Sequence, residues 1–260
     1  MQDLTASSDN SVVVGLGSTG LSCARFLQGQ GRSFCMVDTR LEPPGLADFQ
    51  REFPDVPVLF GEVPDAVVCD AGELIVSPGV ALDNPLVVVA QAAGTQVIGD
   101  IDLFVREASA PIVGITGSNA KSTVTELVGR MASDAGVAVA VGGNLGIPAL
   151  DLLSADIDLY VLELSSFQLE RAGQLNLSVA TVLNVSEDHL DRHGSMSLYH
   201  RAKHNIFGGC SSAVVNLDDS MTTPLVAEDV GVTSWHMGEP ELGGFGLRVE
   251  GGVEFFCGSV

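Results

Sequence analysis

The sequence predicts an α/β fold with two parallel-sheet domains, the first Rossmann-like and the second of the P-loop ATPase type. Short apolar runs that end in glycine turns alternate with helical patterns along the chain, and strands that alternate with helices form parallel sheets. Hydrophobic residues make up 46% of the chain, with 30 glycines and few aromatic residues, a composition that suits this alternation. At 260 residues the chain is long enough for one large or two ordinary domains.

The predicted elements follow from apolar runs and helical periodicity. Strands are expected at residues 11–17, 34–38, 73–79, 137–141, 159–164, 179–183 and 213–216, and helices at 19–28, 84–93, 100–108 and 197–207. The glycine-rich stretch 238–260 indicates turns and short strands. We expect a Rossmann-like domain over residues 1–99 and a central ATP-binding domain over residues 100–260.

The first predicted strand and helix carry a glycine fingerprint. Gly15, Gly17 and Gly20 satisfy G-x-G-x-x-G, and Asp38 ends the next strand. Such glycines allow a tight turn beside a pyrophosphate, while the acidic residue binds a ribose. The spacing leaves three interpretations open: a nicotinamide or flavin site, a nucleotide diphosphate site without nicotinamide, or glycines that serve only the turn.

Residues 111–128 predict a phosphate-binding loop. They contain a buried strand, a turn of small residues and a helix that opens at Lys121. We expect Lys121 to reach the β- and γ-phosphates of ATP and the Ser122 hydroxyl to ligate Mg²⁺. Ala120 stands where a glycine usually precedes the lysine. A capped helix after a strand, without a ligand, is the alternative interpretation.

Glu163 is a single charge inside the apolar strand predicted at 159–164. It lies near the carboxyl end of a strand that is expected to run parallel to the phosphate-loop strand, where Mg²⁺ needs a carboxylate. A carboxylate that is satisfied at a sheet edge is the alternative.

Four of the five histidines lie between positions 189 and 204. His189/His193 and His200/His204 are both i,i+4 pairs, so a zinc site is one interpretation. It is disfavoured because the HExxH pattern is absent and no thiol is near.

Charge and cysteine usage limit the partners and the compartment. Twelve basic against 33 acidic residues leave a formal net charge of −21, which repels nucleic acid and anionic membranes, so we expect neither as a partner. The scattered cysteines lack C-x-x-C spacing, as reduced thiols do. The first residues lack a signal peptide, and no apolar run reaches transmembrane length. We therefore expect a cytoplasmic protein, and a monomer.

From about Val12 to Asp219 the chain resembles the Mur ligases, and among them the members that add D-glutamate. The landmarks are GLGSTGLS, VDTR, VSPG, GDIDLF, TGSNAKSTVTELVG, GGNLG, LELSSFQLE, LNVSEDHLDRH and YHRAK. ELSSFQLE is the most discriminating, because sister ligases differ there. The family uses ATP to join a carboxylate to an amino acid in peptidoglycan precursor synthesis, and so serves cell-wall biogenesis, cell shape and division.

The resemblance implies roles for the candidate residues. Residues expected to cradle the uridine diphosphate or contact the sugar-nucleotide substrate are Ser18, Thr19, Asp38, Thr39, Arg40, Asn144 and Ser165. Those expected to bind ATP are Gly117, Ser118, Asn119, Ala120, Lys121, Ser122 and Thr123. The implied Mg²⁺ ligands are Ser122 and Glu163 for one ion, and His189 and a carbamylated Lys203 for the second. Lys121, His189 and Lys203 are the expected catalytic residues.

The implied reaction has two steps. The carboxylate of UDP-N-acetylmuramoyl-L-alanine attacks the γ-phosphoryl group of ATP, and the amine of D-glutamate then attacks the acyl phosphate. Family members have a third domain for the incoming amino acid. We expect this chain to lack that domain and to hold an incomplete central domain. Residues 1–260 are then expected to bind the uridine nucleotide, to bind ATP weakly and to be inactive alone.

Three alternatives stay open at this point. A NAD-dependent oxidoreductase would explain the first glycine turn and Asp38, but it leaves Lys121, Ser122 and Glu163 without a role. A non-catalytic nucleotide-binding module is the second. Another Mur-type ligase, or one of the folylpolyglutamate type, is the third and is disfavoured by the first domain.

Overall fold

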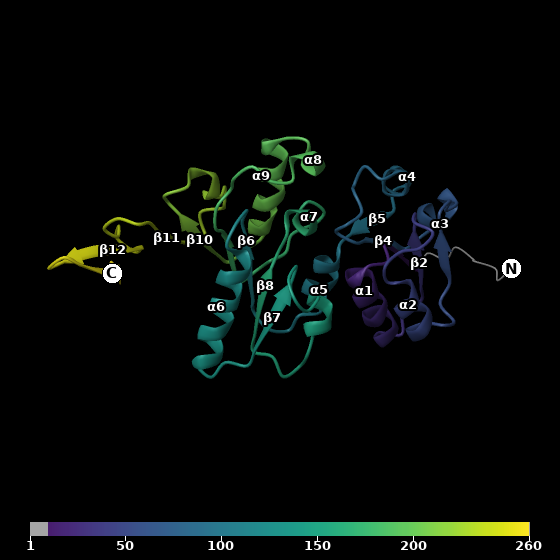
Figure 1. Cartoon of the computed structure of the whole chain (residues 1–260), viewed down its shortest axis with the longest axis horizontal. Coiled ribbons are helices and arrows are strands. Elements are labelled where there is room, and N and C mark those ends of the chain that lie inside the picture. Colours follow the sequence, from purple (N-terminus) through teal and green to yellow (C-terminus); the bar gives the residue numbers. More distant parts are fainter. Residues whose placement is uncertain (1–9, 260) are drawn as a thin grey trace. The chain divides into compact units, whose positions relative to one another are not determined.

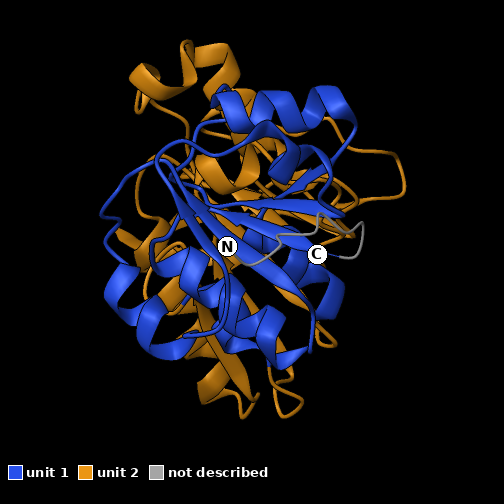
Figure 2. Cartoon of the chain, turned by 90° about the vertical axis from the view of Figure 1, so that its right-hand side faces the viewer, with its two compact units in different colours: residues 1–107, 148–153 blue, residues 108–147, 154–260 orange. Residues whose placement is uncertain are grey.

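The computed structural model describes residues 10–259, which form two compact α/β units. Unit 1 runs to Glu107 and also includes Pro148–Leu153, and unit 2 comprises Ala108–Ile147 and the chain from Ser154 onward (Figure 2). Helix α5 (Asp100–Glu107) therefore belongs to unit 1. The limits 1–99 and 100–260 stay a prediction about the functional domains.

Unit 1 is built on a five-stranded sheet of order β3-β2-β1-β4-β5, in which every neighbouring pair is parallel. Its strands are β1 (Ser11–Val14), β2 (Phe34–Asp38), β3 (Val58–Phe60), β4 (Glu73–Val76) and β5 (Gln96–Ile98). Its helices are α1 (Ser18–Gly29), α2 (Leu46–Glu52), α3 (Asp65–Cys69), α4 (Pro85–Ala93), α5 and the 3₁₀ helix η1 (Ala149–Leu152). The prediction missed β3, β5, α2 and α3, which are short and carry weak patterns.

The central strands of unit 1 are mainly apolar, and every residue of β1, β2 and β4 is buried. Val12 and Val14 on β1, Val37 on β2 and Val76 on β4 are at most 1% exposed. Burial on both faces is the rule for parallel sheets. Each such side chain contributes about 1.5–3 kcal/mol relative to full exposure, so the sheet is a rigid base for the turns at its carboxyl edge.

Gly20 is one of the fingerprint glycines that packing requires. A Cβ at Gly20 would lie 2.1 Å from the Gly15 carbonyl oxygen, whereas a Cβ at Gly17 would have no atom within 4 Å. We therefore expect Gly20→Ala to lower the free energy of unfolding by about 2–3 kcal/mol through overpacking. Denaturant melts measure this, with Gly17→Ala as the matched control. Equal stability of the two variants would contradict the close approach of helix and turn.

Unit 2 contains an eight-stranded sheet of order β13-β12-β11-β10-β9-β6-β8-β7. Its strands are β6 (Ile112–Thr116), β7 (Val139–Gly143), β8 (Leu159–Glu163), β9 (Val179–Val182), β10 (Ser212–Asn216), β11 (Gly231–Trp235), β12 (Phe245–Glu250) and β13 (Val253–Gly258). The β12–β13 pair alone is antiparallel, and Figure 1 shows this hairpin in yellow at the C-terminal end.

In unit 2, helices follow the strands β6, β8 and β9 along the chain, and the candidate residues lie near these junctions. The helices are α6 (Lys121–Asp134), α7 (Ser166–Leu169), α8 (Leu190–His193), α9 (Met196–His204) and the 3₁₀ helices η2 (Asn205–Phe207) and η3 (Ser220–Thr222). The strand expected at 137–141 begins two residues later, at β7, and includes the first glycines of GGNLG. Among residues 10–259 no helix is long and apolar enough to cross a membrane.

Candidate functional site

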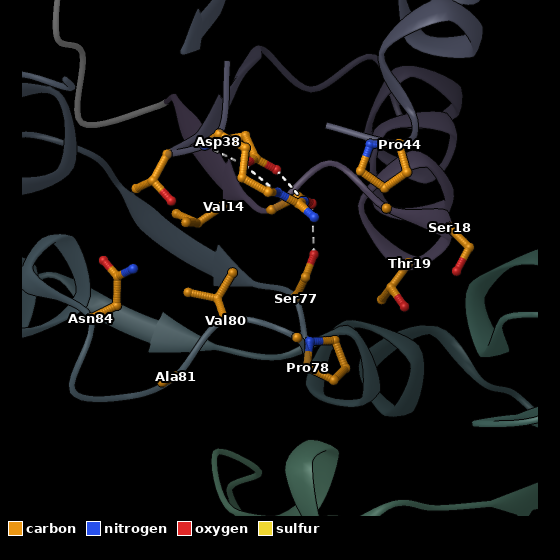
Figure 3. A pocket seen from close by; sticks show the side chains of 15 residues that line it. Val14, Ser18, Thr19, Asp38, Pro44, Ser77, Pro78, Val80, Ala81 and Asn84 are labelled. Atoms are coloured by element: carbon orange, nitrogen blue, oxygen red, sulfur yellow. Dashed lines mark hydrogen bonds and ion pairs between the residues drawn. The ribbon is translucent and has the colours of Figure 1, made fainter. Parts of the chain in front are cut away.

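Unit 1 has a pocket of about 450 Å³ at the carboxyl edge of its sheet. The strand order reverses between β1 and β4, and ligands of open parallel sheets bind at such a reversal. The pocket is lined by Val14, Gly15, Gly17, Ser18, Thr19, Asp38, Thr39, Arg40, Pro44, Ser77, Pro78, Gly79, Val80, Ala81 and Asn84. In Figure 3, Ser18 and Thr19 lie on one side of it and Val80, Ala81 and Asn84 on the other.

The five residues predicted to cradle the uridine diphosphate all line this pocket. Arg40 donates two side-chain hydrogen bonds to the buried Asp38, at 2.9 and 2.6 Å, and the Leu16 amide donates a third at 2.8 Å (Figure 3). Burial acts to raise the pKa of Asp38, but the bonds from Arg40 and Leu16 outweigh it and lower the pKa. Asp38 is therefore an anion that holds the turn after β2, with Arg40 half-exposed beside the pocket.

Ser77 is a pocket residue that the prediction did not single out. Its hydroxyl donates to the Gly15 carbonyl oxygen at 2.8 Å and so joins the turn after β4 to the turn after β1. Asn84 also lines the pocket. Its side-chain oxygen caps α4 by accepting a hydrogen bond from the Leu86 amide. Ser77 belongs to the landmark VSPG, which starts at the last residue of β4. No spacing rule, however, connects Ser77 to the glycine fingerprint.

The phosphate-binding loop lies between β6 and α6, at the strand-order reversal of the unit 2 sheet. The amides of Ser118 and Asn119 donate to the backbone and side-chain oxygens of Asn184, which follows β9. The first backbone bond of α6 runs from the Val124 amide to the Ala120 carbonyl. The amides of residues 121–123 have no intrahelical acceptor, and they carry the positive end of the helix dipole. These groups are suited to an anion.

Ala120 adopts a left-handed conformation, with φ 64°. This is the position where a glycine is usual, and an L-residue with a Cβ costs about 1–2 kcal/mol there. We expect Ala120→Gly to raise the free energy of unfolding by about 1 kcal/mol, after the larger backbone entropy of glycine is subtracted. Thermal melts measure it. A loss of stability would contradict strain at this position.

Ser122 and Asn144 both contact Glu163 at the end of β8. The Ser122 hydroxyl donates to Glu163 Oε2 at 2.7 Å, and Asn144 Nδ2 donates to Glu163 Oε1 at 2.7 Å. Glu163 is 2% exposed, and within residues 10–259 no basic side chain forms an ion pair with it. A buried carboxylate with neutral partners favours a cation beside it. One carboxylate and one hydroxyl suit Mg²⁺, which keeps water and phosphate oxygens as its other ligands.

Lys203 reaches the phosphate loop from α9. Its Nζ donates to the Gly117 carbonyl oxygen at 2.7 Å and lies 4.6 Å from the centre of the Tyr199 ring. The side chain is buried. Burial lowers the pKa of Lys203 to about 7, with a further contribution from the charge of Lys121. Tyr199 also approaches the loop, with its hydroxyl 3.0 Å from Ser118 Oγ.

Lys121, His189 and Ser165 occupy three different settings. Lys121 Nζ donates to the Ser118 carbonyl at 3.2 Å across the turn of the loop. His189 is exposed, and its ring lies 4.9 Å from the Phe167 ring. No hydrogen bond or ion pair between described residues joins His189 to Lys203 or Glu163. Ser165 caps α7 in a capping box with Gln168. The structure thus brings Lys121, Ser122, Asn144, Glu163 and Lys203 together around one loop.

A buried polar group behind His189 was not predicted. His193 Nε2 lies 2.9 Å from Ser166 Oγ, its ring stacks on Phe167 at 5.4 Å, and Glu170 accepts from Arg192 at 2.6 Å. Burial lowers the pKa of His193 against the opposing charge of Glu170. The short helix α8 was not predicted, because its four residues give no periodicity.

A strand, a phosphate loop and a helix, with a carboxylate at the end of the neighbouring strand, define a P-loop nucleotide-binding protein. Comparison with known proteins narrows this class. Residues 9–99 match the family described as "Mur ligase MurD-like, N-terminal domain", and residues 115–239 match "Mur ligase middle domain". The chain belongs to the Mur ligase family.

Relatives of known name resemble the chain over nearly all its length. It is 54% identical over 246 residues to UDP-N-acetylmuramoylalanine--D-glutamate ligase of Pseudomonas syringae pv. tomato, covering 95% of this chain and 55% of that protein. It is 56% identical over 254 residues to the enzyme of the same name from Pseudomonas aeruginosa, covering 98% and 57%. The chain thus spans a little more than half the length of the curated relatives it matches.

Solved structures agree on the fold. UDP-N-acetylmuramate:L-alanyl-gamma-D-glutamyl-meso-diaminopimelate ligase from Neisseria meningitides superposes with a TM-score of 0.57 at 15% identity, over 90% of this chain and 81% of that one. UDP-N-acetylmuramate-alanine ligase from Thermotoga maritima gives a TM-score of 0.52 at 19% identity, over 92% and 54%.

Proposed function

We propose that this chain is the nucleotide-binding part of an ATP-dependent ligase that adds D-glutamate to UDP-N-acetylmuramoyl-L-alanine in the cytoplasm. The observation that carries the proposal is the group of Lys121, Ser122 and Glu163 at the carboxyl edge of the unit 2 sheet, in a chain 54% identical to proteins of that name. Residues 1–99 hold the uridine nucleotide, and residues 100–260 hold ATP. The protein works as a monomer.

The ATP phosphates lie against the free amides at the start of α6. Gly117, Ser118, Asn119, Ala120, Lys121, Ser122 and Thr123 form this cradle. When ATP binds, the Lys121 ammonium leaves the Ser118 carbonyl oxygen and donates to the β- and γ-phosphates instead. An ammonium binds an anion more strongly than it binds a neutral oxygen. Ser122 and Glu163 would hold a Mg²⁺ ion, which would neutralise charge on the phosphates.

Phosphorylation is needed because a carboxylate is a poor acyl donor. The substrate carboxylate oxygen forms a bond to the γ-phosphorus, the bond to the β-γ bridging oxygen breaks, and ADP leaves. The D-glutamate amine then forms the amide, and phosphate leaves with the bonding electrons while the amine loses a proton. Lys121 stabilises the charge that builds up on the transferring group.

We infer that Lys203 becomes a carbamate in the working enzyme, and that it and His189 would hold a second Mg²⁺. A pKa of about 7 supports this, because only the neutral amine attacks CO₂. The nitrogen forms a bond to the carbon and releases a proton, so a buried cation becomes an anion with oxygen donors. In that state the side chain attracts Lys121 instead of repelling it.

In the unit 1 pocket the uridine diphosphate contacts Ser18 and Thr19 at the start of α1, and Asp38, Thr39 and Arg40 after β2. Asn144 and Ser165 contact the sugar-nucleotide substrate. The alternative of a nicotinamide site is tested by titrating NADH and UDP against the chain. Tighter binding of NADH than of UDP would favour an oxidoreductase.

The deciding experiment is phosphate release by the complete gene product with ATP, Mg²⁺ and UDP-N-acetylmuramoyl-L-alanine. We expect release to require D-glutamate, with L-glutamate as the matched control. Release that is independent of the amino acid would indicate an ATPase, and release with a different amino acid would indicate another Mur-type ligase.

A further inference from the structure

Helix α9 carries two histidines, one turn apart, on the side that contacts η3. The rings of His200 and His204 stack with centroids 3.9 Å apart and planes at 28°. Their Nε2 atoms lie 2.9 and 2.8 Å from the same acceptor, the Met221 carbonyl oxygen. The Phe207 ring packs edge-on against His204 at 5.5 Å. Two imidazole nitrogens therefore converge on one carbonyl oxygen.

The distance from each ring nitrogen to the carbonyl oxygen fits two neighbouring ligands of a metal. Each Nε2 lies 2.8–2.9 Å from the Met221 oxygen, and such a pair subtends about 85° at a metal that lies about 2.1 Å from both atoms. This is close to the angle between neighbouring ligands in octahedral and tetragonal complexes, and well below the tetrahedral angle. Cu²⁺ and Ni²⁺ adopt those geometries, accept imidazole ligands and bind more tightly than earlier first-row metals.

We propose that His200, His204 and the Met221 carbonyl form a binding site for a divalent transition-metal cation of the Cu²⁺ or Ni²⁺ type. Both rings are half-buried, so the open positions of the metal are filled by water. On binding, each neutral ring moves its proton from Nε2 to Nδ1, and the freed lone pair ligates the metal. The net charge of −21 raises the local concentration of cations.

The site differs from the Mg²⁺ positions in its donors, since imidazole nitrogens replace carboxylates. Within residues 10–259 no group of three or more His, Cys, Asp or Glu side chains can hold a metal. The carbonyl must therefore supply the third ligand. Since α9 also carries Tyr199 and Lys203, a metal that joins α9 to η3 fixes the helix that supports the phosphate loop.

The test uses metal-stripped protein without an affinity tag. Cu²⁺ is titrated and followed by electron paramagnetic resonance, where we expect a signal split by two imidazole nitrogens and a rise in melting temperature with Ni²⁺. His200→Gln and His204→Gln each keep a side-chain amide donor for the Met221 carbonyl, and each is expected to weaken Cu²⁺ binding at least tenfold. His236→Gln is the control that keeps the wild-type signal, and His189→Gln tests whether Cu²⁺ binds instead at the position proposed for the second Mg²⁺.

Each outcome decides the proposal. Unchanged Cu²⁺ affinity in His200→Gln, or a two-nitrogen signal lost in His189→Gln instead, would overturn it. Melts without metal show whether a variant is folded. Should His204→Gln unfold, the His200→Gln result stands alone, because the Phe207 ring packs against His204.

Discussion

Lys121→Ala is expected to abolish ATP-dependent ligation while the chain stays folded. The side chain is half-buried at the turn of the loop and makes one hydrogen bond, to the Ser118 carbonyl, so its packing contribution is small. Loss of one cation that stabilises charge on the transferring phosphoryl group costs about 3–4 kcal/mol, or a factor of about 10² to 10³ in rate. The measurement is D-glutamate-dependent phosphate release by the complete gene product.

The control removes a cation from the same helix without touching the loop. Arg130 pairs with Asp134 on α6 and its side chain is 76% exposed, so Arg130→Ala is expected to keep the wild-type rate. Melting curves of both variants separate catalysis from folding. A folded Lys121→Ala protein with a near-normal rate would remove this loop from the reaction.

The sheet-forming strands and the glycine turns could be predicted because their signals are local. Val12 and Leu162 belong to apolar runs that are buried on both faces, and such runs are visible without knowledge of their neighbours. The strands β3 and β5 have three residues each, too few for any periodicity. They exist because neighbouring strands offer free backbone groups, which is a tertiary effect.

The residues of the candidate site also fall into two groups: those with a local sequence signal, which could be predicted, and those placed by the tertiary structure, which could not. Lys121 and Ser122 were found from spacing alone, because the chemistry of a phosphate loop lies within a few residues. Glu163 was found because a charge in a buried strand is unusual. Asn184, which accepts from two loop amides, could not be found, since its position depends on β9 lying next to β6. The role of Ser77 in unit 1 could not be found either, since it depends on β4 lying next to β1.

The unmodified side chain of Lys203 is expected to lower the free energy of unfolding, because its charge is buried. In buffer free of CO₂ and Mg²⁺, its buried amine has a pKa of about 7, far below its unfolded value. The unfolded chain therefore binds more protons between about pH 7 and pH 10.5, and the free energy of unfolding of the wild type rises with pH across that window. Below pH 7 the full cost of the buried ammonium is present.

Lys203→Met removes that cost and keeps an unbranched apolar side chain beside Tyr199. The Gly117 carbonyl loses its donor, which costs about 1 kcal/mol. The avoided burial of a charge outweighs this at neutral pH. We therefore expect the variant to be more stable than the wild type at pH 7, by on the order of 1 kcal/mol, with the difference narrowing as pH rises toward 10. Denaturant melts at several pH values measure it.

The same substitution is expected to abolish ligation, because no carbamate can form. Carbon-13 NMR with labelled bicarbonate is expected to show a carbamate resonance in the Mg²⁺-loaded wild type and none in Lys203→Met. His204→Gln, one residue along α9, is the matched control that keeps the amine. A wild type without this resonance would exclude the carbamate. The stability difference is the free energy of unfolding of Lys203→Met minus that of the wild type. A smaller difference at pH 7 than at pH 10 would show that the hydrogen bond to Gly117 outweighs the cost of the buried charge.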